Sequence, residues 1–557
     1  MDIVLDIETT GLNRFKDKIN VCGVYFPEHD YYVPVFSAEA LMTLLNSLPE
    51  KPNMIYANGK FDTLFLEQQW NIPKDYLTID NDIMIMSYIL EMGKRKGLKE
   101  LAKRHCGAED WDVDKKTKTG MSNEMINYNR LDCYWTYEVY KVLKPKIDAD
   151  TRCAKLYYAL AMPTFRAYRN IERRGMYVDV ERIKKMIPEL EAKSSAILAE
   201  LKQVADINWL STAQVGKVFI EQLNMPILKR TPKGAVSIGS EQLEDYALMG
   251  YPIAKKLQEY KDIEKNIGTF LKPWLEQAVD SRLHPNFNID TVRTGRTSCS
   301  EPNLQQVPRD VALRGLFVAP EGKELFECDY SQLELRIACE YAHETTMMNA
   351  YLNNEDLHTK TAQICTGKTE VTKAERRDAK PVNFGFIYGM SAKGYVNYAK
   401  TGYGVIVTED QAKELRNRFF ATYKDLQPWY AKQKRLCNMD GGVFTLFGRF
   451  RALPEIYSEN FADKASAERC CINTPVQSSG SDILLSSMLE IENTLPECEI
   501  VCTVHDSILM YVPKEKIDYY KEKVGEIMRH PKLLDYFGIQ LKVPLDIDIG
   551  AGPWGTH

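Results

Sequence analysis

Short apolar runs and helical patterns alternate over the first 150 residues of the chain. Residues 3–5 and 54–56 are apolar runs of strand character, and amphipathic stretches separate such runs. Alternating strands and helices are typical of an α/β domain, which we expect at residues 1–150.

The pattern changes near residue 155 and again near residue 285. Long charged amphipathic segments, such as residues 180–204 and 241–271, predict a helical lobe between these two points. Strand-like runs return in residues 286–340 and 490–557, whereas residues 341–489 have a mainly helical pattern. This order predicts one sheet domain that is interrupted by a helical insertion.

Composition sets limits without indicating a function. A chain of 557 residues is too long for one compact core, so several domains are expected. Hydrophobic residues make up 44% and charged residues 27%, which indicates a folded globular protein. The formal net charge of -5 argues against a uniformly basic surface but is compatible with a basic groove.

Cysteine spacing and hydropathy exclude further classes of protein. The 13 cysteines include no C-x-x-C pair, which argues against a zinc site or a disulfide framework and fits reduced thiols. The N-terminus lacks a signal-peptide pattern, and no apolar run is long enough to span a bilayer. We therefore expect a cytoplasmic protein with no membrane contact.

Four acidic residues and a tyrosine form the first candidate site. Asp6 and Glu8 share one face at the end of an apolar strand, although a solvated strand edge has the same pattern. Asp62 follows the second apolar run, and Tyr128 and Asp132 are one helical turn apart. If the carboxylates converge, their hard oxygen atoms suit two Mg²⁺ or Mn²⁺ ions that activate water at a phosphodiester.

Two further aspartates form the second candidate site. Asp329 ends an apolar strand ahead of a helical pattern, where the alternative is an N-cap of that helix. Asp506 lies between the apolar runs 501–504 and 508–512, which predicts a hairpin with this acid at its tip. Aspartates on neighbouring strands can share two Mg²⁺ ions, which lower the pKa of an attacking hydroxyl group and orient a phosphate.

Two cations and two aromatic residues lie between these aspartates. On a helix, steps of four residues place Arg376, Lys380, Phe384 and Tyr388 on one face. Such a face fits the phosphates and base of a nucleoside triphosphate, although an amphipathic core helix is an alternative. Pro381 cannot donate a backbone hydrogen bond, so this helix is expected either to begin near it or to kink there.

These motifs resemble two known families. Residues 1–150 resemble the proofreading DEDD exonucleases with a tyrosine in their last motif, which implies metal ligands at Asp6, Glu8, Asp62 and Asp132 and a water-orienting Tyr128. From about residue 155 to the end, the chain resembles motifs A, B and C of the family A DNA polymerases, the DNA polymerase I family. The first likeness implies single-stranded 3′ ends as a ligand, and the second implies primer-template DNA and dNTPs.

The second resemblance assigns expected roles. Asp329 and Asp506 are expected to bind two metal ions with Tyr330 as a further ligand, Lys380 to protonate pyrophosphate, and Glu334 to exclude a ribose 2′-hydroxyl. The expected nucleotide-binding residues are Arg376, Lys380, Phe384, Tyr388, Glu334, Gln332 and His358. The expected DNA-binding residues are Arg296, Asn208, Ser211, Gln214, Asn303, Gln305, Arg469, Asn473, Gln477 and His505.

The implied fold is α/β and α+β multidomain: an RNase H-like 3′-5′ exonuclease domain followed by a right-hand polymerase. Within the thumb, Ser211 and Gln214 are expected to form a capping box at a helix start. The expected divisions are 1–150 for the exonuclease, 155–285 for mainly thumb with a short palm lead-in, 286–340 and 490–557 for the two parts of the palm, and 341–489 for fingers and connecting helices.

The chain departs from the family pattern at Ser507, where a glutamate usually follows the motif C aspartate. We expect Ser507→Glu to change rate or metal preference only modestly, because Asp329 and Asp506 can bridge the metals. No sequence precedes the exonuclease region, so a 5′-nuclease domain is expected to be absent, as in a phage replicative polymerase. We expect a monomer and name no helicase or processivity partner.

Two alternatives stay open at this level. A single-subunit RNA polymerase or reverse transcriptase uses the same palm, and Glu334 and the exonuclease motifs argue against it. The second alternative is a catalytically inactive scaffold that binds primer-template DNA. The presence of both sets of aspartates argues against it.

Overall fold

The first 150 residues form a sheet covered by helices. In this computed structural model, which describes residues 1–231 and 233–555, the strand order is β3-β2-β1-β4-β5. The strands are β1 (Asp2–Thr9), β2 (Ile19–Phe26), β3 (Tyr31–Val35), β4 (Asn53–Tyr56) and β5 (Asn81–Asp82). The helices are α1 (Ala38–Asn46), α2 (Gly59–Gln69), α3 (Ile83–Leu90), α4 (Leu98–Cys106), α5 (Lys115–Thr119) and α6 (Asn123–Ala149). The predicted α/β domain is confirmed.

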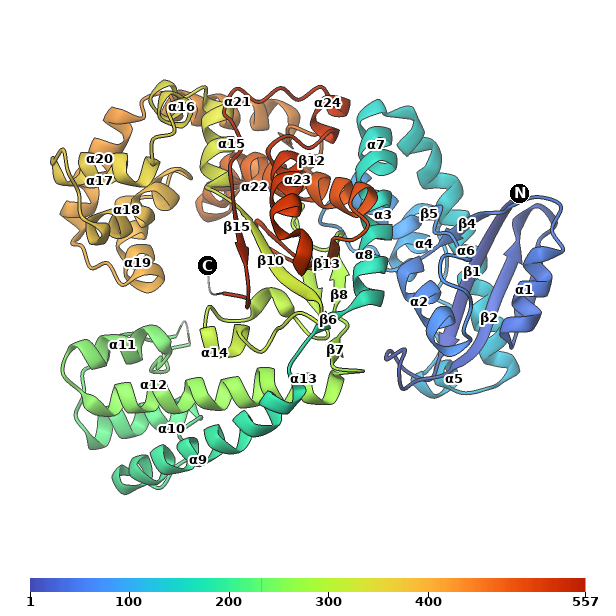
Figure 1. Ribbon diagram of the computed structural model, residues 1–557, viewed down its shortest axis with the longest axis horizontal. Coiled ribbons are helices and arrows are strands. Elements are labelled where there is room, and N and C mark those ends of the chain that lie inside the picture. The colour runs from blue at the N-terminus through green and yellow to red at the C-terminus, as the bar shows by residue number, and fades with distance from the viewer. Residues whose placement is uncertain (232, 556–557) are drawn as a thin grey trace.

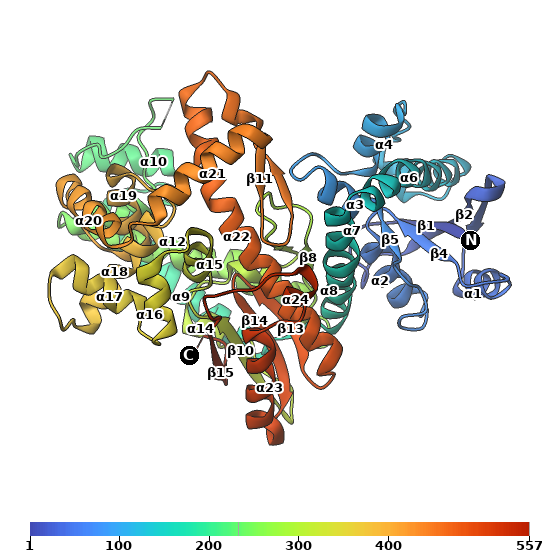
Figure 2. The ribbon, with the colours of Figure 1, turned by 90° about the horizontal axis from the view of Figure 1, so that it is seen from above.

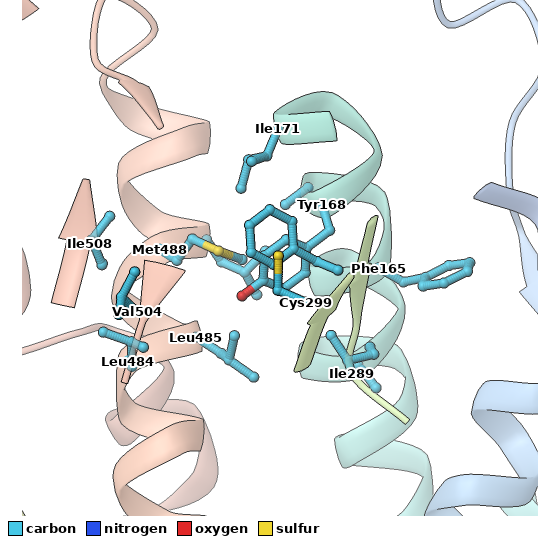
Figure 3. Packing of buried hydrophobic residues seen from close by; sticks show 14 of the residues in the cluster. Phe165, Tyr168, Ile171, Ile289, Cys299, Leu484, Leu485, Met488, Val504 and Ile508 are labelled. Carbon is cyan, nitrogen blue, oxygen red and sulfur yellow. The ribbon is translucent and has the colours of Figure 1, made fainter. Parts of the chain in front are cut away.

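Helices α7 (Thr151–Lys155) and α8 (Met162–Arg174) connect this domain to the rest of the molecule. α8 contacts α2 on one side and α22 (Phe461–Thr494) and β13 (Glu499–Val504) on the other. Figure 3 shows Tyr168 and Ile171 of α8 directed toward Met488 and Leu485 of α22. Tyr168 also hydrogen-bonds Thr503 through its hydroxyl at 2.8 Å, so the first domain is joined to the second sheet by a packed helix.

A helical lobe follows and has its own core. Its helices are α9 (Val180–Val204), α10 (Thr212–Lys217), α11 (Ser240–Leu248), α12 (Pro252–Lys265) and α13 (Lys272–Gln277). Trp209, Phe219 and Tyr246 lie in a cluster separate from the main core. The amphipathic segment 241–271 is two helices, because Gly250 has a φ of 89° and Pro252 starts a new helix.

The second sheet combines distant parts of the chain, as predicted. Its order is β13-β14-β10-β15, with β10 (Lys323–Tyr330), β14 (Ser507–Pro513) and β15 (Ile547–Ala551) beside β13. The insertion contains α15 (Leu333–Ala342), α16 (Thr345–Leu352), α17 (Leu357–Thr366), α18 (Lys373–Phe386), α19 (Ala392–Tyr403), α20 (Glu409–Thr422), α21 (Leu426–Asp440) and α22. The short elements are β6 (Met176–Tyr177), β7 (Arg282–Leu283), β8 (Asn286–Asn288), β9 (Ser298–Ser300), α14 (Val311–Arg314), β11 (Gly442–Phe444), β12 (Phe450–Ala452), α23 (Ile517–Arg529) and α24 (Leu533–Phe537).

The second sheet is the centre of the molecule. Figure 1 shows the lobe α9–α12 on one side of it and helices α16–α20 on another, with the first domain beyond α8. Figure 2 shows the same separation between the first domain and helices α16–α20. None of the helices in the described part of the chain is both long and apolar enough to cross a bilayer.

The helix with the cationic and aromatic residues begins well before its proline. Thr372 caps α18 in a capping box with Glu375, and the helix continues through Pro381 to Phe386. Of the two alternatives, a start near Pro381 is therefore wrong, because the capping box fixes the start at Lys373, and the kink stays a prediction. Arg376, Lys380 and Phe384 lie on this helix, whereas Tyr388 lies in the turn after it, so the prediction of a helical face that includes Tyr388 is wrong.

Candidate active sites

Three of the acids predicted for the first site converge between β1 and α6. Asp6 and Glu8 alternate on β1, and Asp132 lies on α6. One carboxylate oxygen from each of these residues lies within 4.8 Å of the others. Three oxygen donors this close fit a hard divalent cation.

Asp62 is placed under the same strand by a tight turn. Its Oδ1 atom accepts a hydrogen bond from the Ile7 amide at 3.1 Å. The turn depends on Gly59, because a Cβ atom there would lie 2.5 Å from the ring of the buried Tyr56. Asp62 thus borders Asp6, although it is not among the three acids whose oxygen atoms converge.

The crowding of these acids changes their protonation. Burial, and then the charge of Asp62, raises the pKa of Asp6 well above its ordinary value. Burial, and then the charge of Asp132, raises the pKa of Glu8 to about 8. Burial and mutual repulsion thus both disfavour the charged acids, and a bound cation would offset the two effects.

Three neighbours of these acids were not found from the sequence. Lys99 Nζ lies 2.5 Å from Asp132 Oδ1, and Trp111 Nε1 donates to the same oxygen at 2.6 Å. Asn129 Nδ2 donates to Asp6 Oδ2 at 2.7 Å. Lys99 Nζ also lies 4.2 Å from the ring centroid of Tyr128. Asn129 has a local signal, since it follows Tyr128 directly, whereas Lys99 and Trp111 reach the site only through tertiary packing.

The two aspartates of the second site meet on adjacent strands. Asp329 ends β10 opposite Ser507 of β14, and Asp506 lies in the two-residue turn between β13 and β14. The Tyr330 amide donates to the Asp506 carbonyl at 3.1 Å, which joins the two strand ends. The tip geometry depends on His505, which has a φ of 55°.

These carboxylates also hold protons more tightly than usual. Loss of solvent, then the charges of Glu327 and Asp548, raises the pKa of Asp329 to about 6. Burial, then the charge of Glu334, raises the pKa of Asp506 to about 7. The two acids on neighbouring strands form a second group that a divalent cation would stabilise.

Tyr330 does not offer its side chain to this group. Its hydroxyl is buried and bonds Ser487 Oγ at 2.7 Å and the Met528 carbonyl at 2.6 Å. The sequence predicted Tyr330 as a metal ligand. With its hydroxyl engaged elsewhere, only its backbone carbonyl oxygen is left for that role.

Glu334 is held from two sides. The Tyr388 hydroxyl donates to Glu334 Oε2, and Arg296 Nη2 pairs with Glu334 Oε1. These contacts join α15, the turn that follows α18 and the loop between β8 and β9, beside Asp506. The carboxylate therefore has a fixed position next to the aspartates.

The other residues of the α18 face are half-buried. Arg376 forms two hydrogen bonds with Asp356, with Nε–Oδ2 at 2.5 Å and Nη2–Oδ1 at 3.0 Å. Gln332 Nε2 donates to Asp356 Oδ1 at 3.3 Å, so two expected nucleotide contacts meet at one acid. Lys380 and Phe384 lie on the same face of α18.

His358 lies behind this face. It is buried, its Nδ1 atom is 2.8 Å from Asn383 Nδ2, and its ring centroid is 5.7 Å from that of Phe384. Burial lowers the pKa of His358 to about 4, so the ring is uncharged at neutral pH.

The expected DNA-binding residues fall into two groups. Three lie at steps of four along α22, where Arg469 is exposed and the other two are partly exposed: Arg469, Asn473 and Gln477. Asn303 caps a short turn, and Gln305 Nε2 donates to the Thr503 carbonyl at 3.0 Å behind Asp506. His505 is exposed beside Asp506.

The remaining group lies apart, at the start of α10 in the helical lobe. Ser211 Oγ accepts from the Gln214 amide at 3.5 Å, as expected of an N-cap. Gln214 Oε1, however, accepts from the Asn208 amide at 2.8 Å instead of from Ser211. The expected capping box is wrong, because the Ser211 amide already donates to the Asn208 carbonyl.

Comparison with known proteins matches both halves of the chain. The family model described as DNA polymerase family A matches residues 180–556, and the one described as 3′-5′ exonuclease matches residues 1–148. A solved structure described as the POL domain of Pol1 from M. smegmatis in complex with DNA primer-template and dNTP has a TM-score of 0.85 at 24% identity. That alignment covers 99% of this chain and 95% of the other.

Curated relatives include three bacterial enzymes named DNA polymerase I. The Aquifex aeolicus protein is 30% identical over 95% of this chain and 92% of its own length. The Pseudomonas aeruginosa protein is 28% identical over 99% of this chain and 63% of its own length. The Bacillus subtilis protein is 32% identical over 72% of this chain and 45% of its own length. Together with the two acid sites, these matches show that the chain belongs to DNA polymerase family A and carries a 3′-5′ exonuclease domain.

Proposed function

We propose that the chain extends primer 3′ ends on a DNA template at Asp329 and Asp506, and removes misincorporated nucleotides at Asp6, Glu8, Asp62 and Asp132. The observation that carries the proposal is the pair of carboxylate groups, one at each sheet. In each group several carboxylates lie close together, and their oxygen atoms are donors that fit Mg²⁺ or Mn²⁺.

In the polymerase site the chain's own residues position the reactants. Bound divalent cations would supply charge neutralisation and a lowered pKa for the attacking hydroxyl. Asp329 and Asp506 would hold them, while Arg376 and Lys380 receive the triphosphate and Lys380 gives a proton to the leaving pyrophosphate. Glu334, fixed by Tyr388 and Arg296, limits the space for a ribose 2′-hydroxyl and so selects dNTPs.

In the exonuclease site we assign Tyr128 the role of orienting the attacking water. Its ring lies one helical turn from Asp132, and Lys99 packs against it. Asn129 and Trp111 hold Asp6 and Asp132 in place by hydrogen bonds. The proposed ligands are a single-stranded 3′ end here and primer-template DNA with dNTPs in the other site. The M. smegmatis structure is likewise a complex with DNA primer-template and dNTP, which supports the second pair of ligands.

The proposal extends to a replicative role in a phage, with two metal ions in each site. The curated relatives named above are bacterial, so the phage origin rests on the expectation from the sequence alone.

Primer extension with matched and mismatched 3′ ends tests the assignment. The double variant Asp6→Ala/Glu8→Ala is expected to lose degradation of single-stranded DNA and to keep extension of a matched primer. Asp329→Ala, the matched control, is expected to lose extension and keep degradation. Degradation that persists in the first variant, or extension that persists in the second, contradicts the respective assignment.

A further inference from the structure

Three facing positions cross the second sheet at the polymerase site. Asp329 of β10 is paired with Ser507 of β14 on one side and with Asp548 of β15 on the other. Residues directly opposite in antiparallel strands share a face, with Cβ atoms about 4.5–5.5 Å apart. The side chains of Ser507, Asp329 and Asp548 therefore form one row, and Asp506 adjoins its Ser507 end.

One end of this row lacks an acid. Ser507 takes the position where a glutamate usually follows the motif C aspartate. Its hydroxyl is buried and has no hydrogen-bond partner among the described residues. A buried polar group without a partner costs stability unless a ligand or water satisfies it.

The other end of the row carries an acid that forms no direct ion pair among the described residues, although the charge of Arg336 lies near enough to interact with it. Asp548 is exposed, and within the described ranges it forms no hydrogen bond or ion pair. The neighbouring Asp546, in contrast, lies 3.7 Å from Arg336 and 3.9 Å from Arg529. The unpaired carboxylate of Asp548 faces Asp329, where two like charges oppose each other across the strands.

We propose that Asp548 is the accessory carboxylate of the polymerase site and binds a divalent cation together with Asp329. It supplies from β15 the negative charge that Ser507 does not supply from β14. This inference rests on the polymerase site proposed above and adds to it a metal-positioning residue. The two like charges are left facing each other because a cation between them removes the repulsion.

Binding of Mn²⁺ alone, measured by electron paramagnetic resonance, tests the proposal. The full chain carries Asp6→Ala/Glu8→Ala, so that the exonuclease site does not contribute. Adding Asp548→Asn is expected to weaken Mn²⁺ binding by about tenfold, as losses of supporting ligands commonly do. Asp546→Asn, the matched control with arginine partners, is expected to leave the affinity unchanged.

A rescue variant separates a lost ligand from a disturbed fold. Ser507→Glu added to Asp548→Asn is expected to restore Mn²⁺ affinity, because it returns a carboxylate to the same row on the opposite side of Asp329. Thermal unfolding in EDTA should not shift to a lower temperature in Asp548→Asn, since the side chain is exposed and the substitution removes its repulsion with Asp329.

Two results overturn different claims. Unchanged Mn²⁺ affinity in Asp548→Asn, with affinity lost in Asp329→Asn, removes Asp548 and leaves the polymerase site standing. Unchanged affinity in Asp329→Asn removes the proposed polymerase site itself, and Asp548 with it.

Discussion

At the scale of single residues, Lys99 is the chain's own cation at the exonuclease acids. Its ammonium group contacts Asp132 and packs on the rings of Tyr128 and Trp111. Because it balances part of the negative charge, the acids tolerate each other without a metal ion. A divalent cation that binds there competes with Lys99 for Asp132.

We expect Lys99→Met to destabilise the metal-free protein and to strengthen divalent metal binding. Loss of the charge partner should lower the free energy of unfolding in EDTA by about 1 kcal/mol, measured by urea denaturation. Lys118→Met is the control, because Lys118 also lies near Tyr128 but pairs with Asp112. Weaker Mn²⁺ binding in Lys99→Met would contradict the competition.

Asp356 pairs with Arg376, which we propose to bind the triphosphate, so we expect Asp356 to compete with the nucleotide for this arginine. We expect Asp356→Asn to lower the KM for dNTPs about two- to fivefold, which corresponds to the worth of a partly exposed ion pair. Asparagine keeps the N-cap bond to Thr359, so α17 should be retained. Steady-state kinetics of primer extension measure this KM, with Glu355→Gln as the control. An unchanged KM in Asp356→Asn would argue against a role for the Asp356–Arg376 pair.

At the scale of elements, the local sequence pattern predicts most helices and strands. It predicts little of which distant residues come together in the folded chain. The helix at 180–204 and the sheet shared by distant segments were expected and are found. The sequence pattern does not predict the break between α11 and α12 at Gly250, because the amphipathic pattern of one helix continues into the other. Asp6, Glu8 and Asp132 were identified from motif spacing, whereas Lys99 and Asp548 were not, because strand register and helix docking join residues that no local period relates.

The turn between β4 and α2 is the element that fixes Asp62. We expect Gly59→Ala to reduce exonuclease activity while matched-primer extension is kept, because the added methyl group collides with the buried Tyr56 and shifts α2. Rates of single-strand degradation and of extension on one sample measure the two effects. Gly97→Ala at the start of α4, where a Cβ atom meets nothing within 4 Å, is the control. Equal losses in both activities would point to general unfolding instead.

At the scale of the whole molecule, a buried ion pair joins the two catalytic domains. Lys60 of α2 pairs with Glu172 of α8, and each side chain is 3% exposed. Lys60 Nζ also donates to the Phe287 carbonyl at 2.5 Å, and the Phe287 amide donates to Glu172 Oε1 at 2.7 Å. α2, α8 and β8 thereby meet at a single point.

We expect Lys60→Met to lower the free energy of unfolding by about 3 kcal/mol, because it leaves Glu172 charged and buried. The double variant Lys60→Met/Glu172→Gln should recover most of this loss, since the glutamine oxygen still accepts from Phe287. Urea denaturation of the single and double variants provides the comparison. A double variant as unstable as the single one would mean that packing, and not charge, dominates the junction.

The same junction bears on how a primer end changes sites. Lys60 lies two residues before Asp62, and Phe287 lies on the hairpin whose loop carries Arg296 beside Glu334. This interior contact and the packing of α8 on α22 and β13 together join the two domains. If primer ends pass between the two proposed sites while this junction stays intact, we expect the melting of the duplex, rather than a separation of the domains, to limit how soon a mismatch is removed.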